Sequence, residues 1–187
     1  MINILFAGNE KVFDGVLTCI LSILKRTETK EPFAVYLMTM DVSHIKDTYT
    51  PISDRQVDFL RGVIKKYNPE NEVVKIDVTP LYDKEFANCP NEDAYCSPYT
   101  LIRLFADQVD SLPDKLLYLD VDIMFNRDVR LLYDTDVSGV EYAAARAICS
   151  IKETCRNHLI AYAAEESRIS GKVIDMADYE KSLGGLK

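Results

Sequence analysis

The sequence has few of the residues on which zinc and redox sites are built. It contains only two histidines, His44 and His158, and its five cysteines form no Cys-x-x-Cys pair. No spacing typical of a His/Cys zinc site is therefore present, and we expect the cysteines to be reduced. A catalytic cysteine–histidine pair remains an alternative, although no pattern favours it.

Runs of basic residues are also missing. The formal net charge is -8, with 30 acidic against 22 basic residues, and no block of consecutive lysines or arginines occurs. Nucleic acid is therefore not expected as a partner. An anionic small substrate would need a local metal ion or a specific arginine to hold it.

Long apolar runs are absent as well. The densest stretch, residues 16–24, is interrupted by Thr18 and Ser22 and is too short to span a bilayer. The first residues lack the basic start of a signal peptide. We expect a cytoplasmic protein without a transmembrane segment, which could contact a membrane surface only through regions missing from these residues. With 187 residues, 48% hydrophobic and 28% charged, the composition predicts a globular domain.

Apolar periodicity predicts strands that alternate with helices. Ser53 and Gln56 form a capping box at one helix start, Leu104 and Phe105 are expected to face inward in the helix after Pro98, and residues 79–98 are predicted to be a long loop. The expected order is strand 2–7, helix from residue 12, strand 33–40, helix 53–67, strand 72–78, helix 98–109, strand 115–124, helix 129–133, strand 142–148 and helix 151–169. This alternation predicts an α/β fold with a mainly parallel sheet flanked by helices.

The strand predicted at residues 115–124 carries Asp120 and Asp122 with one valine between them. Strand side chains alternate faces, so both carboxylates project the same way from Cα atoms ~6.5–7 Å apart and can reach one cation. Mg²⁺ or Mn²⁺ suits such a pair, because these ions take oxygen ligands and keep positions for water or phosphates. The alternative interpretation is that the aspartates end the strand and begin a turn. At the carboxyl edge of a parallel sheet they would lie near residues 7–9.

Two segments resemble glycosyltransferase family 8, which includes bacterial lipopolysaccharide galactosyltransferases and glycogenins. The stronger one contains Tyr99-Thr-Leu-Ile-Arg103, then Leu117-Tyr-Leu-Asp-Val-Asp122, and then Leu131-Leu-Tyr-Asp134 with Asp136. The interval from Arg103 to Asp120 matches that of the family. The weaker segment is the opening Leu5-Phe-Ala-Gly-Asn-Glu10. The resemblance implies a GT-A type, Rossmann-like core at residues 1–139, with a divergent or incomplete strand and helical segment at residues 140–187.

The resemblance also implies roles for single residues. Asp120 and Asp122 would hold Mn²⁺ or Mg²⁺, with Asp120 also near the donor sugar or ribose. Ala7 and Asn9 would contact the uracil and ribose, although the family commonly has aspartate at the position of Asn9, and Arg103 would contact the donor sugar or its phosphates. For Arg103 the alternative is a surface ion pair. No catalytic nucleophile or base is predicted.

The implied activity is metal-dependent transfer of a hexose, with retention, from a UDP-sugar to a hydroxyl of a saccharide or glycolipid. The family's later motifs, among them a His-x-x-Gly-x-x-Lys-Pro-Trp segment, are not found, and the chain has no tryptophan. The chain is therefore a portion of a longer protein or a degenerate relative, and a noncatalytic UDP-sugar-binding domain is one alternative. A phosphohydrolase of the haloacid dehalogenase type is another, but Met124 stands where that class usually has threonine or valine.

Overall fold

The computed structural model describes residues 1–86, 97–140 and 143. The chain divides into two units, Met1–Asp136 and Val137–Lys187, and the elements described below belong to the first. The strand predicted at 142–148 and the helix predicted at 151–169 lie outside the described residues. The predicted boundary between residues 139 and 140 stays a prediction.

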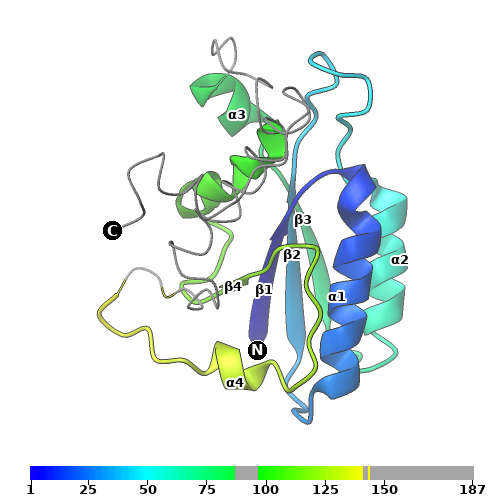
Figure 1. The fold of residues 1–187 in the computed structure, drawn as a ribbon, viewed down its shortest axis with the longest axis vertical. Helices are drawn as coiled ribbons and strands as arrows, with labels where there is room; N and C mark the ends of the chain where they lie inside the picture. The colour runs from blue at the N-terminus through cyan, green and yellow to red at the C-terminus, as the bar shows by residue number, and fades with distance from the viewer. Residues whose placement is uncertain (87–96, 141–142, 144–187) are drawn as a thin grey trace, which may run out of the picture. The chain divides into compact units, whose positions relative to one another are not determined.

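A parallel sheet forms the centre of this unit (Figure 1). It contains β1 (Ile2–Ala7), β2 (Phe33–Thr39), β3 (Glu72–Asp77) and β4 (Leu117–Tyr118) in the order β3-β2-β1-β4. From β1 the chain passes to β2 and then β3, and it later returns to place β4 on the other side of β1. The strand order therefore reverses between β1 and β4, and the predicted α/β fold with a parallel sheet is confirmed.

Helices cover both faces of the sheet. In Figure 1, α1 (Phe13–Arg26) and α2 (Asp54–Ile64) lie together on one side, and α3 (Thr79–Glu85) lies on the other. Side chains that alternate along the strands supply two separate cores. The core toward α1 and α2 includes Ile2, Ile4, Phe6, Phe33, Val35, Leu37 and Val73 from the strands. The other includes Leu5, Ala34, Tyr36 and Met38.

The two long helices follow their sequence signals. The 3₁₀ helix η1 (Glu10–Val12) leads into α1, which buries Phe13, Val16, Cys19 and Ile20 at helical spacing. Burial raises the pKa of the Cys19 thiol to about 11, so this side chain is a neutral core residue. The capping box of Ser53 and Gln56 is present at the start of α2.

Residues 79–109 differ from the prediction in two ways. The predicted loop contains α3, which has a proline in its first turn and buries Tyr82. The predicted helix after Pro98 is two short 3₁₀ helices, η2 (Pro98–Thr100) and η3 (Ile102–Gln108). A 3₁₀ helix has about three residues per turn, so Ile102 and Phe105 are buried whereas Leu104, which was predicted to face inward, is 60% exposed.

The predicted strand at residues 115–124 is also much shorter than expected. Only Leu117 and Tyr118 form β4, and a turn follows at residues 121–122. β4 pairs with β1 alone among the described strands, and it does so only at Ile4 and Leu5. The short helix predicted at 129–133 is confirmed as α4 (Arg130–Tyr133). No helix in the described ranges is long and apolar enough to cross a membrane.

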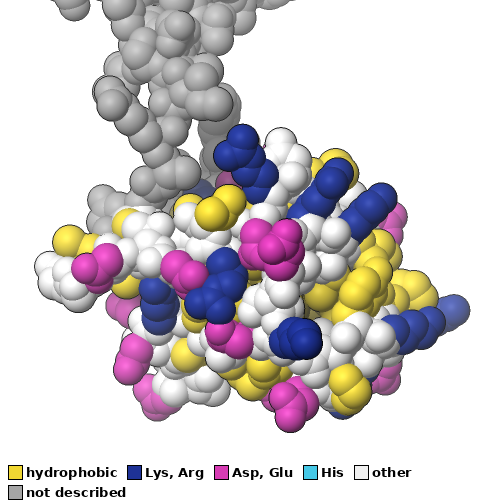
Figure 2. Space-filling view, turned by 90° about the horizontal axis from the view of Figure 1, so that it is seen from below, with side chains coloured by type: hydrophobic (Ala, Val, Ile, Leu, Met, Phe, Trp, Pro, Cys, Tyr) yellow, Lys and Arg dark blue, Asp and Glu magenta, His cyan; other side chains and the backbone are white. Residues whose placement is uncertain are grey.

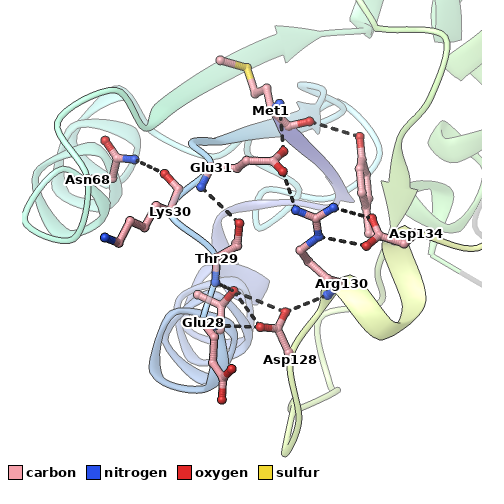
Figure 3. Close-up of polar contacts among 11 residues, drawn as sticks. Met1, Glu28, Thr29, Lys30, Glu31, Asn68, Asp128, Arg130 and Asp134 are labelled. Carbon is pink, nitrogen blue, oxygen red and sulfur yellow. Dashed lines mark hydrogen bonds and ion pairs between the residues drawn. The ribbon is translucent and has the colours of Figure 1, made fainter.

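A polar network ties α4 to the turn that precedes β2 (Figure 3). The Asp128 carboxylate accepts hydrogen bonds from the Glu28 backbone N–H at 2.7 Å and from the Thr27 hydroxyl at 3.3 Å. Arg130 pairs with both Glu31 and Asp134.

The face seen in Figure 2, at the amino ends of the strands, carries acidic and basic side chains intermixed. This edge therefore lies opposite the carboxyl edge to which the predicted site residues belong.

Candidate functional site

The predicted site residues follow β1 and β4, the two strands between which the strand order reverses. Leu5 lies opposite Tyr118 in the register, and the Leu119 N–H donates to the Leu5 carbonyl at 3.0 Å. Ala7 and Asp120 each come two residues after that pair, so both lie at the carboxyl ends of neighbouring strands. Ligands of open α/β sheets bind at such a point of reversal.

The turn after β1 brings Asn9 into a buried position. The Gly8 N–H donates to the Met38 carbonyl at 3.0 Å, which holds the turn against β2. Asn9 is 7% exposed, and its Oδ1 accepts a hydrogen bond from the Lys11 N–H at 3.2 Å, which caps η1. No hydrogen bond joins the Asn9 Nδ2 group to another residue of the described part. The side chain thus has one structural contact and a donor that a ligand could use.

The two aspartates point to the exposed side of their segment. Leu119 is buried and Val121 packs against the core between α1, α2 and the sheet, whereas Asp120 and Asp122 are exposed. The alternation expected of a strand therefore persists through residue 122, although the backbone there forms a turn. The aspartates follow a strand and enter a turn, as the alternative interpretation expected. The metal site stays a prediction.

Arg103 and Tyr118 meet Asp120 at this edge. Ile102 and Phe105 anchor η3 in the core, which leaves Arg103 on the exposed side. Its guanidinium lies 3.9 Å from Asp120 Oδ1, at the limit of an ion pair, and 5.8 Å from the centre of the Tyr118 ring. The structure thus brings together Arg103 and Asp120, which are far apart in sequence and which the motif spacing had linked.

Tyr118 is a site residue that the sequence argument missed. Its hydroxyl donates to Asp120 Oδ1 at 3.0 Å. Burial, and next the negative charge of Asp120, raise the pKa of Tyr118, while Arg103 opposes this effect. The phenol is therefore protonated at neutral pH and remains a donor. Its position two residues before Asp120 on a strand was a signal for this contact, because residues i and i+2 share a face.

The donor atoms at this edge fit a hard divalent cation that is shared with a ligand. The described residues contain no group of three or more His, Cys, Asp or Glu side chains that could hold a metal. Asp120 and Asp122 alone would leave most positions of an octahedral ion to water and phosphate oxygens, which is how Mg²⁺ sites of phosphate-binding proteins are commonly built. A shallow pocket of ≈ 380 Å³ lies farther along, between residues 123–128 and Leu131 and Leu132, and contains none of these side chains.

Comparisons with known proteins find glycosyltransferases among the proteins similar to this chain. A putative glycosyltransferase of Haemophilus influenzae (strain ATCC 51907 / DSM 11121 / KW20 / Rd) is 24% identical over 144 residues, which are 77% of this chain and 38% of that protein. The crystal structure of galactosyltransferase LgtC in complex with donor and acceptor sugar analogs matches with a TM-score of 0.52 and 22% identity, over 73% of this chain and 44% of that one. The apo-form glycosyltransferase GlyE of Streptococcus pneumoniae TIGR4 matches with a TM-score of 0.50 and 19% identity, over 97% and 42%.

These likenesses establish a GT-A type α/β fold. The chain spans less than half the length of the relatives it matches. The family model described as Glycosyl transferase family 8 matches residues 3–173, so the likeness extends beyond residue 136, where the motifs seen in the sequence end. The chain belongs to glycosyl transferase family 8.

Proposed function

We propose that this chain binds a UDP-sugar at the carboxyl edge of β1 and β4 and transfers its hexose, with retention, to a hydroxyl of a saccharide or glycolipid acceptor. The observation that carries the proposal is the convergence of three chain segments at the point where the strand order reverses. The turn after β1 brings Asn9, η3 brings Arg103, and the segment after β4 brings Asp120. Family membership supplies the class of reaction.

The turn after β1 would hold the nucleoside. Ala7, a small residue at the end of β1, would contact the base or the ribose. The Asn9 Nδ2 group, buried and with no partner in the described part of the chain, would donate to a carbonyl of the uracil or to a ribose oxygen. An asparagine can serve here as well as an aspartate, because an amide both donates and accepts.

Asp120 and Asp122 would hold Mn²⁺ or Mg²⁺ together with the diphosphate of the donor. The ion would stabilise the negative charge that develops on UDP as the bond from the sugar carbon to the phosphate oxygen breaks. In a chain of net charge -8, an anionic leaving group would need such a local cation or a specific arginine. Arg103, 3.9 Å from Asp120, would orient the sugar or contact a phosphate oxygen from the other side.

The proposal is tested by calorimetric titration of UDP with and without Mn²⁺. We expect Asp120→Ala and Asp122→Ala to abolish Mn²⁺-dependent UDP binding while the far-ultraviolet circular dichroism stays unchanged. Asp114→Ala is a matched control, because Asp114 is an exposed aspartate on the same chain segment before β4 and should bind as the unaltered chain does. Unchanged UDP affinity in either site variant would refute the metal site.

A noncatalytic UDP-sugar-binding domain is the second candidate, favoured by the fact that the chain spans 38–44% of the relatives compared. The two candidates differ in turnover. Release of UDP from UDP-glucose or UDP-galactose in the presence of Mn²⁺ and a saccharide acceptor supports the transferase. Mn²⁺-dependent UDP binding with no UDP release supports the binding domain. The family assignment disfavours the haloacid dehalogenase alternative. Acid-labile release of phosphate from a phosphoester that is abolished by Asp120→Asn would support that alternative instead.

A further inference from the structure

Helix α1 contains a glycine, Gly15, in its first turns. Glycine destabilises a helix interior relative to alanine, because its backbone loses more freedom on folding. The described chain has a second glycine of this kind, Gly62 in α2. The surroundings of the two glycines differ sharply, and this difference assigns a role to Gly15.

A Cβ atom added to Gly15 would lie 2.5 Å from the backbone oxygen of Val121 and 3.1 Å from the Val121 Cβ. A Cβ added to Gly62 would meet nothing within 4 Å. The atom closest to Gly15 is main chain, so a flexible side chain could not simply move aside. Val121 is also the residue between Asp120 and Asp122. A shift of Val121 that accommodated a Cβ would therefore move the backbone that carries both carboxylates.

The contact at Gly15 is the first of three that α1 and the residues just after it make with residues 121–128, a segment that we call the strap. The second is in the middle of the strap, where the Phe125 N–H donates to the hydroxyl oxygen of Ser22 at 2.8 Å. Ser22 is buried and donates its own proton to the Cys19 carbonyl at 2.6 Å, so its oxygen is fixed as an acceptor. The third is beyond the end of the helix, where the Asp128 carboxylate accepts from the Glu28 N–H (Figure 3).

The three contacts occur in the same order along the helix and along the strap. Figure 1 shows the strap descending beside α1 from the end of β4 to α4. The strap has no regular secondary structure after the turn at residues 121–122, so its own backbone does not fix its position. Helix α1 fixes the start and the middle of the strap, and the loop after α1 fixes its far end.

We propose that Gly15 is a positioning residue of the site, and that α1 sets where Asp120 and Asp122 lie through the strap. This inference rests on the proposed function, because it takes the two aspartates as the ligands of the divalent ion. The alternative is that Gly15 only allows close packing and affects stability alone. The two cases differ in the affinity of the folded protein for Mn²⁺.

The test compares Gly15→Ala with Gly62→Ala in the 187-residue chain. Free Mn²⁺ is measured by electron paramagnetic resonance in titrations with UDP present, and the folded fraction of each variant is measured by urea denaturation. We expect Gly15→Ala to weaken Mn²⁺ binding about 10- to 100-fold, the range observed when groups that orient metal ligands are altered. Gly62→Ala should bind within about twofold of the unaltered chain, because its Cβ meets open space.

Three results are distinguishable. If the unaltered chain does not bind Mn²⁺ with UDP, the proposed function fails. If the unaltered chain binds and Asp120→Ala does not, but folded Gly15→Ala binds as tightly as Gly62→Ala, only the role of Gly15 is overturned. If Gly15→Ala does not fold, Ser22→Ala takes its place, since it removes the acceptor of the Phe125 N–H. Weakened Mn²⁺ binding by that variant supports the role of α1, and unchanged binding overturns it.

Discussion

Replacing Tyr118 by phenylalanine removes one hydroxyl from the candidate site and leaves the ring in place. The bond that is lost joins the phenol to Asp120 Oδ1 at 3.0 Å. A hydrogen bond to a charged group contributes about 1.5–3 kcal/mol when it is sheltered from water. The Asp120 side chain is 62% exposed, so solvent screening reduces this contribution to about 0.5–1 kcal/mol.

A loss of this size corresponds to about a two- to fivefold change in an equilibrium constant. We therefore expect Tyr118→Phe to weaken Mn²⁺ binding by that factor, because Asp120 loses the group that orients it. The paramagnetic titration used for Gly15→Ala measures the effect. Tyr133→Phe is a matched control, since its hydroxyl contacts Asn3 and the Lys115 carbonyl, away from the aspartates, and it should leave Mn²⁺ affinity unchanged.

The pKa of Tyr118 is raised by burial and by Asp120, so the phenol donates throughout the neutral range. The ratio of Mn²⁺ affinities between the unaltered chain and Tyr118→Phe should therefore be constant from about pH 6 to pH 9. Tighter binding by Tyr118→Phe would contradict this reasoning, because it would mean that the hydroxyl competes with the metal for the carboxylate. A ratio that changed with pH in this range would also contradict it.

Three further predictions concern stability and donor binding. Asn71→Ala should lower the free energy of unfolding in urea by about 2–5 kcal/mol, because Asn71 is buried and satisfies two backbone groups at 2.8 and 2.9 Å. Asn68→Ala should cost less than about 1 kcal/mol, because the hydrogen bonds of Asn68 with the Lys30 carbonyl and the Glu70 N–H are exposed to solvent. The hydrogen bond from the Glu28 N–H lowers the pKa of Asp128. Asp128 therefore stabilises the fold above about pH 4, and this contribution is lost as the pH falls toward the lowered pKa. In urea titrations at low pH, the difference in free energy of unfolding between the unaltered chain and Asp128→Asn should shrink accordingly. Arg103→Ala should weaken UDP-glucose binding in calorimetry by about tenfold, and Arg103→Lys by less, while equal affinity in all three proteins would remove Arg103 from the site.

The central strands and the two long helices could be predicted because each is specified by its own residues. β2 is a continuous apolar run, α1 has a stripe at helical spacing, and α2 has a capping box. Such signals are local, and packing against the sheet only reinforces them. The predicted carboxyl edge followed directly, since the order of strands and helices determines where strand ends meet.

Elements whose limits depend on neighbours could not be predicted in this way. Residues 79–98 are predicted to be a loop, but Pro80 is compatible with the first turn of a helix such as α3. β4 is paired only at Leu117 and Tyr118 and a turn follows at residues 121–122, which the apolar run of residues 115–124 does not reveal. In η3 the change to about three residues per turn turns Leu104 outward.

The residues of the candidate site also fall into those that the sequence predicts and those that it does not. Asp120, Asp122 and Arg103 could be predicted from the motif and its spacing. Tyr118 and Gly15 could not be assigned from spacing alone, because one acts through a hydrogen bond to its neighbour and the other through the room it leaves for a distant backbone. Residues that position others show their role only when the distances are known.

The buried thiol of Cys19 has a consequence for measuring motion in this protein. A thiol whose pKa is raised to about 11 by burial reacts with a disulfide reagent only when its surroundings open to solvent, since the thiolate is the reactive form. Cys19 lies on α1, and its backbone carbonyl accepts a hydrogen bond from the Ser22 hydroxyl. In a chain whose other cysteines are replaced, the rate at which a disulfide reagent labels Cys19 therefore reports how often α1 separates from the sheet.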